Sequence, residues 1–258
     1  MRYIIRLSYD GAEFCGWQIQ TRFKSVQEEL QKALSTLLRC DISVTGAGRT
    51  DTAVNAVNYI AHFDWPGTEP LQADAVSYKI NAMIPKGIVV HEICECSEDF
   101  HARFDAKERE YHYFIHRKKD PFMGKFSYFC RFPLDLEAMN KACEYLLGEH
   151  DFSCFEKVGG NNTTSICTVF EASWETYTPT HASLLGYDFE EGDYIVFKVK
   201  ANRFLRNMVR AIVGTMIEVG RGKQKPEWVE SLIASGTRSD AGASVPGNAL
   251  FFNSAKYE

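Results

Sequence analysis

The stretch Thr45–Ala56 reads TGAGRTDTAVNA and lies between two runs, 41–45 and 57–63, that we expect to be strands. Its glycines let the backbone come close to a large ligand. Arg49, just before Asp51, carries a guanidinium that can contact phosphate or stack on a base. Taken alone, an aspartate after glycines is most simply a helix N-cap or an exposed loop acid. The role of Asp51 therefore has to be argued from the rest of the chain.

The same stretch resembles a phosphate-binding loop only superficially. Gly46 and Gly48 lack the third glycine of a dinucleotide fingerprint, and no Gly-Lys-Ser or Gly-Lys-Thr follows them. A second candidate, Gly222-Lys223, lacks the upstream glycine of a P-loop. These patterns argue against the common nucleotide-cofactor sites, and we expect no cofactor.

Length and composition are those of an ordinary globular protein. The chain has 258 residues, of which 45% are hydrophobic and 24% charged, enough for one large or two medium cores. No apolar run approaches the roughly 18 to 20 residues that span a bilayer. The N-terminus also lacks the pattern of a signal peptide. We therefore expect a cytoplasmic protein.

Eight cysteines are spread over apolar-periodic segments. None belongs to a Cys-x-x-Cys motif or pairs with a histidine at zinc-ligand spacing. Because free cysteine favours protein interiors, the pattern indicates buried, reduced thiols. We expect neither a disulfide scaffold nor a metal site.

The charge is unevenly distributed. The net charge of −5 would seem to argue against a nucleic-acid partner, since such domains usually carry a basic face. Between Lys198 and Lys225, however, positive residues are opposed only by Glu218. They are Lys198, Lys200, Arg203, Arg206, Arg210, Arg221, Lys223 and Lys225. We call this set the basic run.

Hydrophobic periodicity predicts the elements of the first half. Residues 3–10 alternate as a strand does, and the spacing of Ser25 and Glu28 is that of a capping box. A helix should follow, with Val26, Leu30, Leu34 and Leu37 on one face. A short helix at 73–81 is expected within a loop-rich region.

The second half has similar signals. We expect strands at 111–116, 169–174, 194–201 and around 250–252. Helices are expected at 135–147 with Gly148 as its C-cap, at 202–219 closed by Gly220, and from Pro226 to 234. The polar stripe of the long helix would hold Arg203, Arg206, Asn207 and Arg210.

Strands and helices interleave without the strict rhythm of a parallel sheet, so the expected class is α+β. The chain divides into two halves, 1–100 with the Asp51 loop and 101–258 with Tyr111 and the basic run. Each half reads strand, helix, strand, which suggests an internal duplication.

The glycine-rich stretch matches a known signature. Residues 46–56 resemble the loop of the tRNA pseudouridine synthase A (TruA) family, whose catalytic aspartate falls on Asp51. Further blocks keep the family's order across nearly the whole chain: Tyr9–Gly11, Gly16–Gln20, Phe100–Phe104, Arg109–Tyr113, His150–Ser153, Asn202–Leu205, Met208–Arg210, Ile212–Gly214 and Glu218–Gly222. The departures are Asn55 where a histidine is usual, Thr52-Ala53 in place of Ala-Gly, a loose tail motif at Ala243–Pro246, and the stretch Asn161–Thr168, which lacks an arginine often found there.

The resemblance implies a fold and an activity. The fold would have two similar halves with mixed or antiparallel sheets flanked by helices, and an active-site cleft between them. The activity would be the isomerisation of uridine to pseudouridine in the anticodon stem-loop of tRNA, near positions 38 to 40. A homodimer would carry it out.

The resemblance also assigns catalytic roles. Asp51 would be the nucleophile or the sugar-side base. Because a dry pocket disfavours a charged carboxylate, a cation must oppose it, and the family places Arg210 beside the aspartate. Tyr111 would hold the uracil ring and help to remove the C5 proton. Without the resemblance, Arg210 would be a solvated helix arginine and Tyr111 a core side chain.

Further residues would bind the substrate. Arg49 would fill the space left by an extruded nucleotide, since a base within a stem cannot otherwise reach a buried carboxylate. Leu250 would line the base pocket. The basic run, with Arg203 and Arg206, would contact phosphates, so affinity should fall steeply as salt rises.

Two other classes of function compete with this interpretation. A non-catalytic tRNA-binding protein on the same scaffold would bind RNA whether or not Asp51 is intact. A cysteine-dependent uridine-modifying enzyme would need an exposed, activated thiolate.

Overall fold

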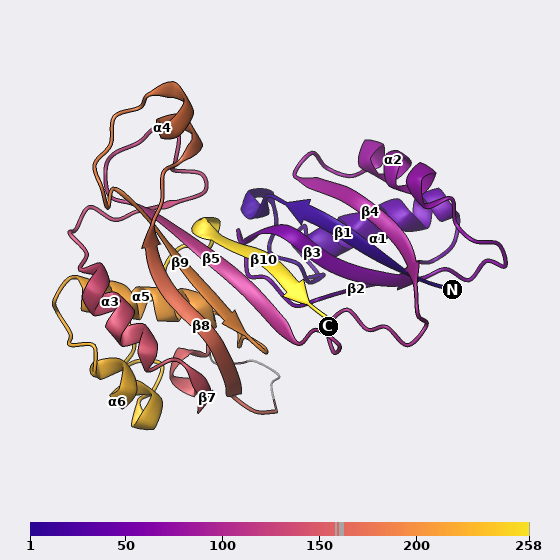
Figure 1. Ribbon diagram of the computed structural model, residues 1–258. Coiled ribbons are helices and arrows are strands. Elements are labelled where there is room, and N and C mark those ends of the chain that lie inside the picture. The colour runs from indigo at the N-terminus through magenta and orange to yellow at the C-terminus, as the bar shows by residue number, and fades with distance from the viewer. Residues whose placement is uncertain (158, 160–162, 258) are drawn as a thin grey trace. The chain divides into compact units, whose positions relative to one another are not determined.

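The computed structural model describes residues 1–157, 159 and 163–257, and it has the expected α+β class. The chain forms two compact units (Figure 1). The first unit comprises Met1–Glu108 and Phe251–Glu258, and the second comprises Arg109–Leu250. The last strand is grouped with the first unit because it pairs there, whereas the domain limits expected from sequence were 1–100 and 101–258.

The first unit is built on a sheet with the order β4-β1-β3-β10. Strands β1 (Arg2–Tyr9), β3 (Asn55–Asp64) and β4 (Ile88–Cys96) are antiparallel neighbours. Strand β2 (Val44–Gly46) pairs with β3 antiparallel, and β10 (Leu250–Lys256) pairs with the start of β3 in parallel. Every second residue of β1 is buried, which is the alternation that the sequence predicts.

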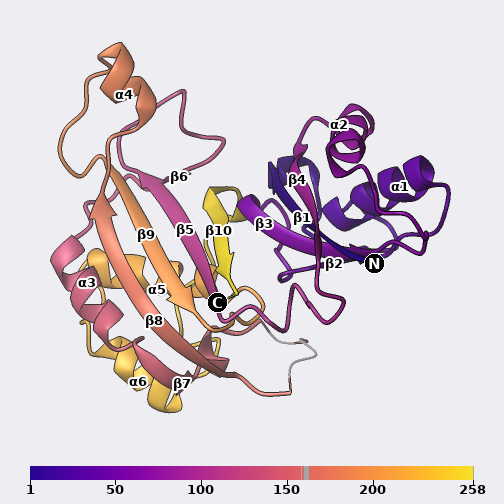
Figure 2. The ribbon, with the colours of Figure 1, turned by 45° about the vertical axis from the view of Figure 1, so that its right-hand side comes forward.

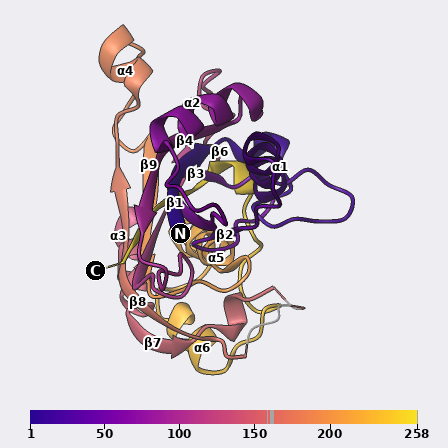
Figure 3. The ribbon, with the colours of Figure 1, turned by 90° about the vertical axis from the view of Figure 1, so that its right-hand side faces the viewer.

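Two helices cover one face of this sheet. They are α1 (Val26–Leu38) and α2 (Ala73–Met83), which lie next to each other in Figure 3. The Ser25 side chain accepts a hydrogen bond from the Glu28 amide, so the predicted N-cap is confirmed. Val26, Leu30 and Leu34 of the predicted stripe are buried.

The second unit has a sheet with the order β5-β9-β8-β7. Its strands are antiparallel: β5 (Glu108–His116), β9 (Tyr194–Ala201), β8 (Ile166–Thr176) and β7 (Gly148–Asp151). A short strand, β6 (Tyr128–Phe129), joins β5 in parallel. The aromatic rings of Trp174 and Phe197 meet between β8 and β9 and belong to the core.

Helices of the second unit pack on the sheet, as Figure 2 shows. Helix α3 (Leu136–Glu144) lies against β8 and against α5 (Met208–Gly220), which is buried along nearly its whole length. Helix α6 (Trp228–Ser235) follows, and α4 (Thr180–Leu185) stands on the excursion between β8 and β9. Single turns of 3-10 helix occur at Gly11–Glu13, Ser153–Phe155 and Gly247–Ala249.

Two predicted helix limits are wrong. The chain turns after Glu144 and enters β7 at Gly148, so that glycine starts a strand and is not the C-cap of α3. The long helix begins at Met208 and not at Asn202, because Asn207 has φ 66° in the left-handed region and interrupts a right-handed helix. Within the described part of the chain, no helix is both long and apolar enough to cross a membrane.

Candidate active site

The glycine-rich loop of the first unit connects β2 to β3 and is held by hydrogen bonds to Tyr59 of β3. The Tyr59 hydroxyl donates to the Gly48 carbonyl and accepts from the Gly48 amide at 3.3 Å. The Ala47 amide donates to the Ile60 carbonyl at 2.8 Å. Gly46 lies so close to Trp17 that a Cβ there would meet its indole ring at 2.6 Å. The loop therefore cannot lift away from the sheet without breaking these contacts.

Thr50, which precedes Asp51, is held by the segment after β1. The Tyr9 hydroxyl lies 2.9 Å from Thr50 Oγ1, and the Trp17 amide donates to the Thr50 carbonyl at 3.2 Å. Gly16 has φ 83°, and a Cβ on it would lie 2.2 Å from the Thr50 carbonyl oxygen. Only glycine permits this close approach. The motifs around Tyr9 and Gly16, to which no sequence pattern assigns a role, hold the loop in place.

Asp51 itself begins a tight turn. Its carbonyl accepts from the Val54 amide at 3.1 Å, and the Ala53 amide donates to the Phe14 carbonyl at 3.3 Å. Ala53 has φ 64° in the left-handed region, which explains why a glycine suits that position in the resembled signature. Asn55, which stands where a histidine is usual, accepts the Gly11 amide at 2.9 Å through Oδ1. Both departures from the signature leave the backbone of the turn hydrogen-bonded.

Arg49 is exposed on the same loop. Its Nε donates to Gln18 Oε1 at 3.2 Å, and Gln18 in turn donates to Gln27 Oε1 at 2.9 Å. The guanidinium is therefore directed by the segment that also holds Thr50. Its role at an RNA surface stays a prediction.

Tyr111 belongs to the second unit and lies on β5, where it pairs with Val199 of β9. Its side chain is 7% exposed, and its ring meets that of Phe204 edge to face, with centroids 5.0 Å apart. Phe204 belongs to one of the motifs that resemble the family, and its contact fixes the orientation of the Tyr111 ring.

Arg210 lies in the first turn of α5 and is tied to the tail motif. Its Nε donates to the Val245 carbonyl at 2.7 Å, and the Val245 amide donates to the Arg210 carbonyl at 3.3 Å. Next to this pair, Asn207 Nδ2 donates to Ser244 Oγ at 2.6 Å. The tail motif thus orients the guanidinium, a role that no local pattern in the sequence indicates because the two segments are far apart in the chain.

Arg203 and Arg206 precede α5 and do not share its polar face, in contrast to the prediction. They lie in a loop that is anchored at Asn202, whose Oδ1 accepts from the Thr168 amide at 2.9 Å. The Asn202 carbonyl accepts from Arg109 at 2.6 Å. Arg206 is exposed, and its carbonyl accepts from the Lys157 amide at 3.0 Å.

Leu250 is buried and begins β10. Phe251, the next residue, pairs with Asn55 at the start of β3. Asp51 and Arg49 belong to the first unit, whereas Tyr111, Arg210 and Leu250 belong to the second, so their assembly into one site stays a prediction.

Carboxylates pair with several cations of the basic run. Lys198 pairs with Glu175 at 2.6 Å and Lys200 with Glu171 at 2.7 Å. Arg221 and Lys223 both pair with Glu218, at 3.2 and 2.9 Å. These pairs join neighbouring elements on the surface and weaken the expected phosphate-contacting wall, whose positive field then depends on the remaining cations.

The thiols are not arranged as nucleophiles. All eight cysteines are free, but only Cys130, Cys143, Cys154 and Cys167 are buried, fewer than expected. Burial raises the pKa of Cys143 and Cys154 to about 12 and that of Cys167 to about 11. The pKa values of Cys94, Cys96 and Cys130 are raised by the same cause. A raised pKa opposes thiolate formation, which disfavours cysteine-dependent catalysis.

Metal ligation finds no support in the part of the chain that the structure describes. No three histidine, cysteine, aspartate or glutamate side chains gather there as a metal ion would require. The chemistry of the loop residues is instead that of a carboxylate on a rigid turn beside an arginine.

Known proteins resemble this chain over nearly all of its length. A family model described as tRNA pseudouridine synthase matches residues 142–258. The tRNA pseudouridine synthase A of Bacteroides fragilis is 45% identical over 99% of this chain and 96% of its own length. Those of Parabacteroides distasonis and Bacteroides thetaiotaomicron are 43% and 44% identical over 99% of this chain, and over 96% and 90% of their own lengths. The chain belongs to the tRNA pseudouridine synthase A family.

Proposed function

We propose that this chain is an isomerase that converts uridine to pseudouridine in tRNA, with Asp51 as its essential carboxylate. The observation that carries the proposal is the turn at Asp51, in which the Thr50 and Asp51 carbonyls and the Ala53 amide are all hydrogen-bonded. Such a turn fixes the backbone from which the carboxylate projects, which favours a positioned nucleophile. Membership of the family supplies the substrate class.

The reaction needs no external donor. The N1–C1′ bond of uridine breaks, the uracil turns, and C5 forms a bond to C1′. The C5 proton then leaves and N1 gains a proton, so the atoms balance within one nucleotide. Asp51 attacks either C1′ of the ribose or C6 of the base, and both routes remain open.

Other residues are proposed to assist. Arg210, oriented by the Val245 carbonyl, is proposed to keep Asp51 ionised. Tyr111 is proposed to hold the uracil ring and to help remove the C5 proton. Arg49 is proposed to fill the place of the extruded nucleotide, and Leu250 to line the base pocket.

The position modified in tRNA, the oligomeric state and the cellular location are inferred from the family resemblance. We propose the anticodon stem-loop, near positions 38 to 40, as the site of modification, and a cytoplasmic homodimer as the active form. Arg203 and Arg206 are proposed to contact phosphates of the bound tRNA, from the anchored loop before α5.

Replacing the carboxylate by an amide tests the catalytic claim. Asp51→Asn keeps the size of the side chain but removes its nucleophilic charge, so we expect isomerisation to fall at least about a thousandfold, as for loss of a catalytic nucleophile. The measurement is tritium release from unmodified tRNA that carries C5-tritiated uridine.

Binding of tRNA by the same variant separates the two classes of function. The proposal predicts that Asp51→Asn binds tRNA about as well as the parent, because the carboxylate does not bind phosphate. Asp41→Asn serves as a control that should keep both tRNA binding and tritium release, since Asp41 is exposed and lies outside the motifs that hold the loop. If neither the parent chain nor any variant releases tritium although all are folded and bind tRNA, the non-catalytic interpretation holds instead.

A further inference from the structure

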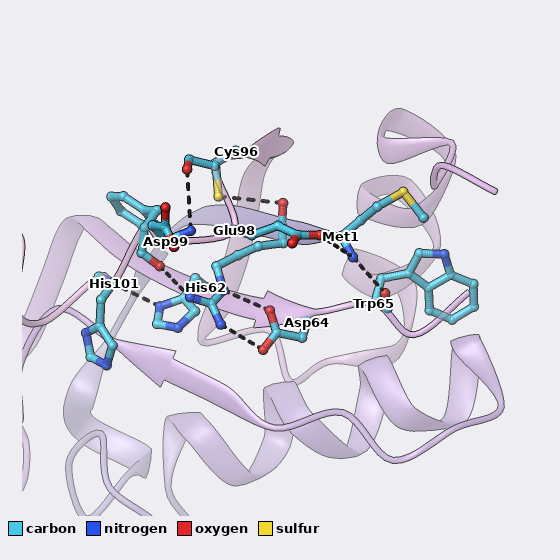
Figure 4. A network of polar contacts seen from close by, with 12 residues as sticks. Met1, His62, Asp64, Trp65, Cys96, Glu98, Asp99 and His101 are labelled. Carbon is cyan, nitrogen blue, oxygen red and sulfur yellow. Dashed lines mark hydrogen bonds and ion pairs between the residues drawn. The ribbon is translucent and has the colours of Figure 1, made fainter. Parts of the chain in front are cut away.

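The turn Phe100–Asp105 follows β4 in the first unit and is one of the family-like motifs to which the catalytic proposal gives no task. It is pinned to the sheet at two points. The Ala102 amide donates to His62 Nδ1 of β3 at 3.1 Å, and Arg2 of β1 donates to the Phe100 carbonyl at 2.9 Å. Arg2 also forms two hydrogen bonds with Asp64, at 2.8 and 2.9 Å. Figure 4 shows this network, with His62 next to His101.

His101 organises the turn from within. Its Nδ1 accepts from the amides of both Arg103 and Phe104 at 3.2 Å. Its own amide donates to Asp105 Oδ2 at 2.7 Å, and the Asp105 amide donates back to the His101 carbonyl at 3.0 Å. Because Nδ1 accepts, the imidazole in this arrangement is neutral and carries its proton on Nε2.

His62 is the buried neighbour of His101, and its Nδ1 likewise accepts a hydrogen bond, from the Ala102 amide. Desolvation lowers its pKa to about 4, with Arg2 and His101 adding to the effect. At neutral pH the His62 imidazole is therefore able to accept the Ala102 amide. The backbone of the turn is rigid before any ligand arrives.

This rigid turn exposes an aromatic ring. Phe104 is 73% exposed, whereas Ala102 and Ala106 on either side are buried. The His101 ring stacks on Phe104 with centroids 4.2 Å apart and planes 27° from parallel. The Arg103 guanidinium lies over the same ring, 5.7 Å from its centroid. The ring is thus exposed while its neighbours fix its orientation, which is the arrangement of a platform on which a base can stack.

Cationic side chains flank the ring in the chain. Arg103 and Lys107 are exposed, and the Lys107 amide donates to the carbonyl of Lys256, whose side chain is exposed as well. The nearby carboxylate of Asp105 is engaged by the His101 amide. A flat ring beside a guanidinium and lysines is the combination that binds single-stranded nucleic acid, because bases stack on the ring and cations meet the phosphates.

We propose that the Phe100–Asp105 turn is a second tRNA-binding element, in which Phe104 stacks on an unpaired base and Arg103 contacts the phosphate backbone. The proposal rests on the proposed function for its substrate class. In it, His101 acts as a positioning residue that keeps the ring in place for stacking. The element contributes to binding and not to the chemical step.

Three replacements of Phe104 test the stacking. Phe104→Ala should weaken tRNA binding about tenfold, within the usual range for one base on one aromatic ring. The KM for tRNA should rise by a similar factor while kcat stays the same. Phe104→Trp should restore binding, whereas Phe104→Leu, which is apolar but cannot stack, should not. Tyr78, 80% exposed on α2, supplies the matched control Tyr78→Ala, which should bind like the parent.

Two further variants test the supporting contacts. His101→Asn offers a side-chain oxygen close to the place of Nδ1 and should keep binding near that of the parent, while His101→Ala should lower it. Thermal unfolding of each variant checks that it is folded. A fluorescent 2-aminopurine in the RNA loop reports the stack directly, because stacking on a ring quenches it, and Phe104→Ala should reduce the quenching.

The outcomes are distinct from those of the catalytic test. Equal tRNA affinity of folded Phe104→Ala, Phe104→Leu and parent chains would overturn the proposal. So would a loss of self-association in Phe104→Ala with unchanged tRNA affinity, since Phe104 would then face a second copy. If the parent binds tRNA in a Phe104-dependent way but releases no tritium, the catalytic proposal fails and this one stands.

Discussion

Asn55 shows how one buried amide holds the reactive loop in place. It is 2% exposed at the first position of β3, and its Oδ1 accepts the Gly11 amide at 2.9 Å. Asn55→Ala removes this acceptor and leaves a buried amide that water cannot easily reach. We therefore expect the free energy of unfolding to fall by about 1 to 3 kcal/mol. Urea denaturation measures the change.

Asn58 offers a matched comparison because it is exposed on the same strand. Asn58→Ala should change the free energy of unfolding by less than about 0.5 kcal/mol. Equal effects of the two substitutions would mean that the Gly11 contact contributes nothing specific. Because Gly11 and Asn55 adjoin the Asp51 turn, tritium release should also fall in Asn55→Ala and not in Asn58→Ala.

At the scale of elements, α5 packs closely against the tail motif at Gly214. A Cβ on Gly214 would lie 1.8 Å from the Ala243 carbonyl oxygen, which is backbone and cannot rotate away. Gly214→Ala would gain up to about 1 kcal/mol of helix propensity. Because the tail must shift to admit the methyl group, we expect a net loss of about 2 to 3 kcal/mol in the free energy of unfolding.

Activity provides a second readout of the same substitution. Residues Ala243–Val245 carry the carbonyl that orients Arg210, so a shifted tail should also lower kcat under conditions where Gly214→Ala is folded. Gly124→Ala is the control, since a Cβ at Gly124 has nothing within 4 Å. A folded Gly214→Ala chain with parental stability and kcat would contradict this account of Arg210.

Local sequence patterns predict most helices and strands, but not the strand pairing and backbone conformations that surround them. The alternation of β1 and the capping box of α1 act within a few residues, so they are legible in the sequence. Strand β4 was not expected, since its burial does not alternate regularly and its pairing with β1 shifts register between Arg6 and Leu7. The start of α5 was placed too early because apolar spacing continues through Asn207, whose backbone conformation has no periodic signal.

The candidate site was predicted in a different way. Asp51, Tyr111 and Arg210 were named through the family resemblance, since each has a simpler structural explanation when taken alone. The groups that position them, Tyr59, Phe204 and Val245, come from other parts of the chain. No local spacing joins such partners, and only the folded units reveal them.

For the whole molecule, the charge distribution sets how an acidic protein can bind RNA. The net charge is −5, and Glu175, Glu171 and Glu218 pair with four cations of the basic run, so that three negative charges offset three of those four positive charges. Phosphate binding must therefore rely on cations outside these pairs. Arg206 is exposed, and no ion pair engages it among the residues that the structure describes. Asn202 anchors the loop before α5, so the backbone that carries Arg206 is held in place.

Salt dependence of tRNA binding tests this distribution. Removing one phosphate-binding cation lowers the slope of log affinity against log salt by about 1, so Arg206→Ala should lower it by that amount. Lys223→Ala should leave the slope nearly unchanged, because Lys223 already pairs with Glu218 at 2.9 Å and Arg221 remains as the second partner of that carboxylate. Filter binding between 50 and 200 mM salt, about the range over which such effects are large, measures both slopes. A parental slope for Arg206→Ala would contradict its phosphate contact, whereas slopes lowered by about 1 in both variants would mean that the Lys223–Glu218 ion pair opens when tRNA binds.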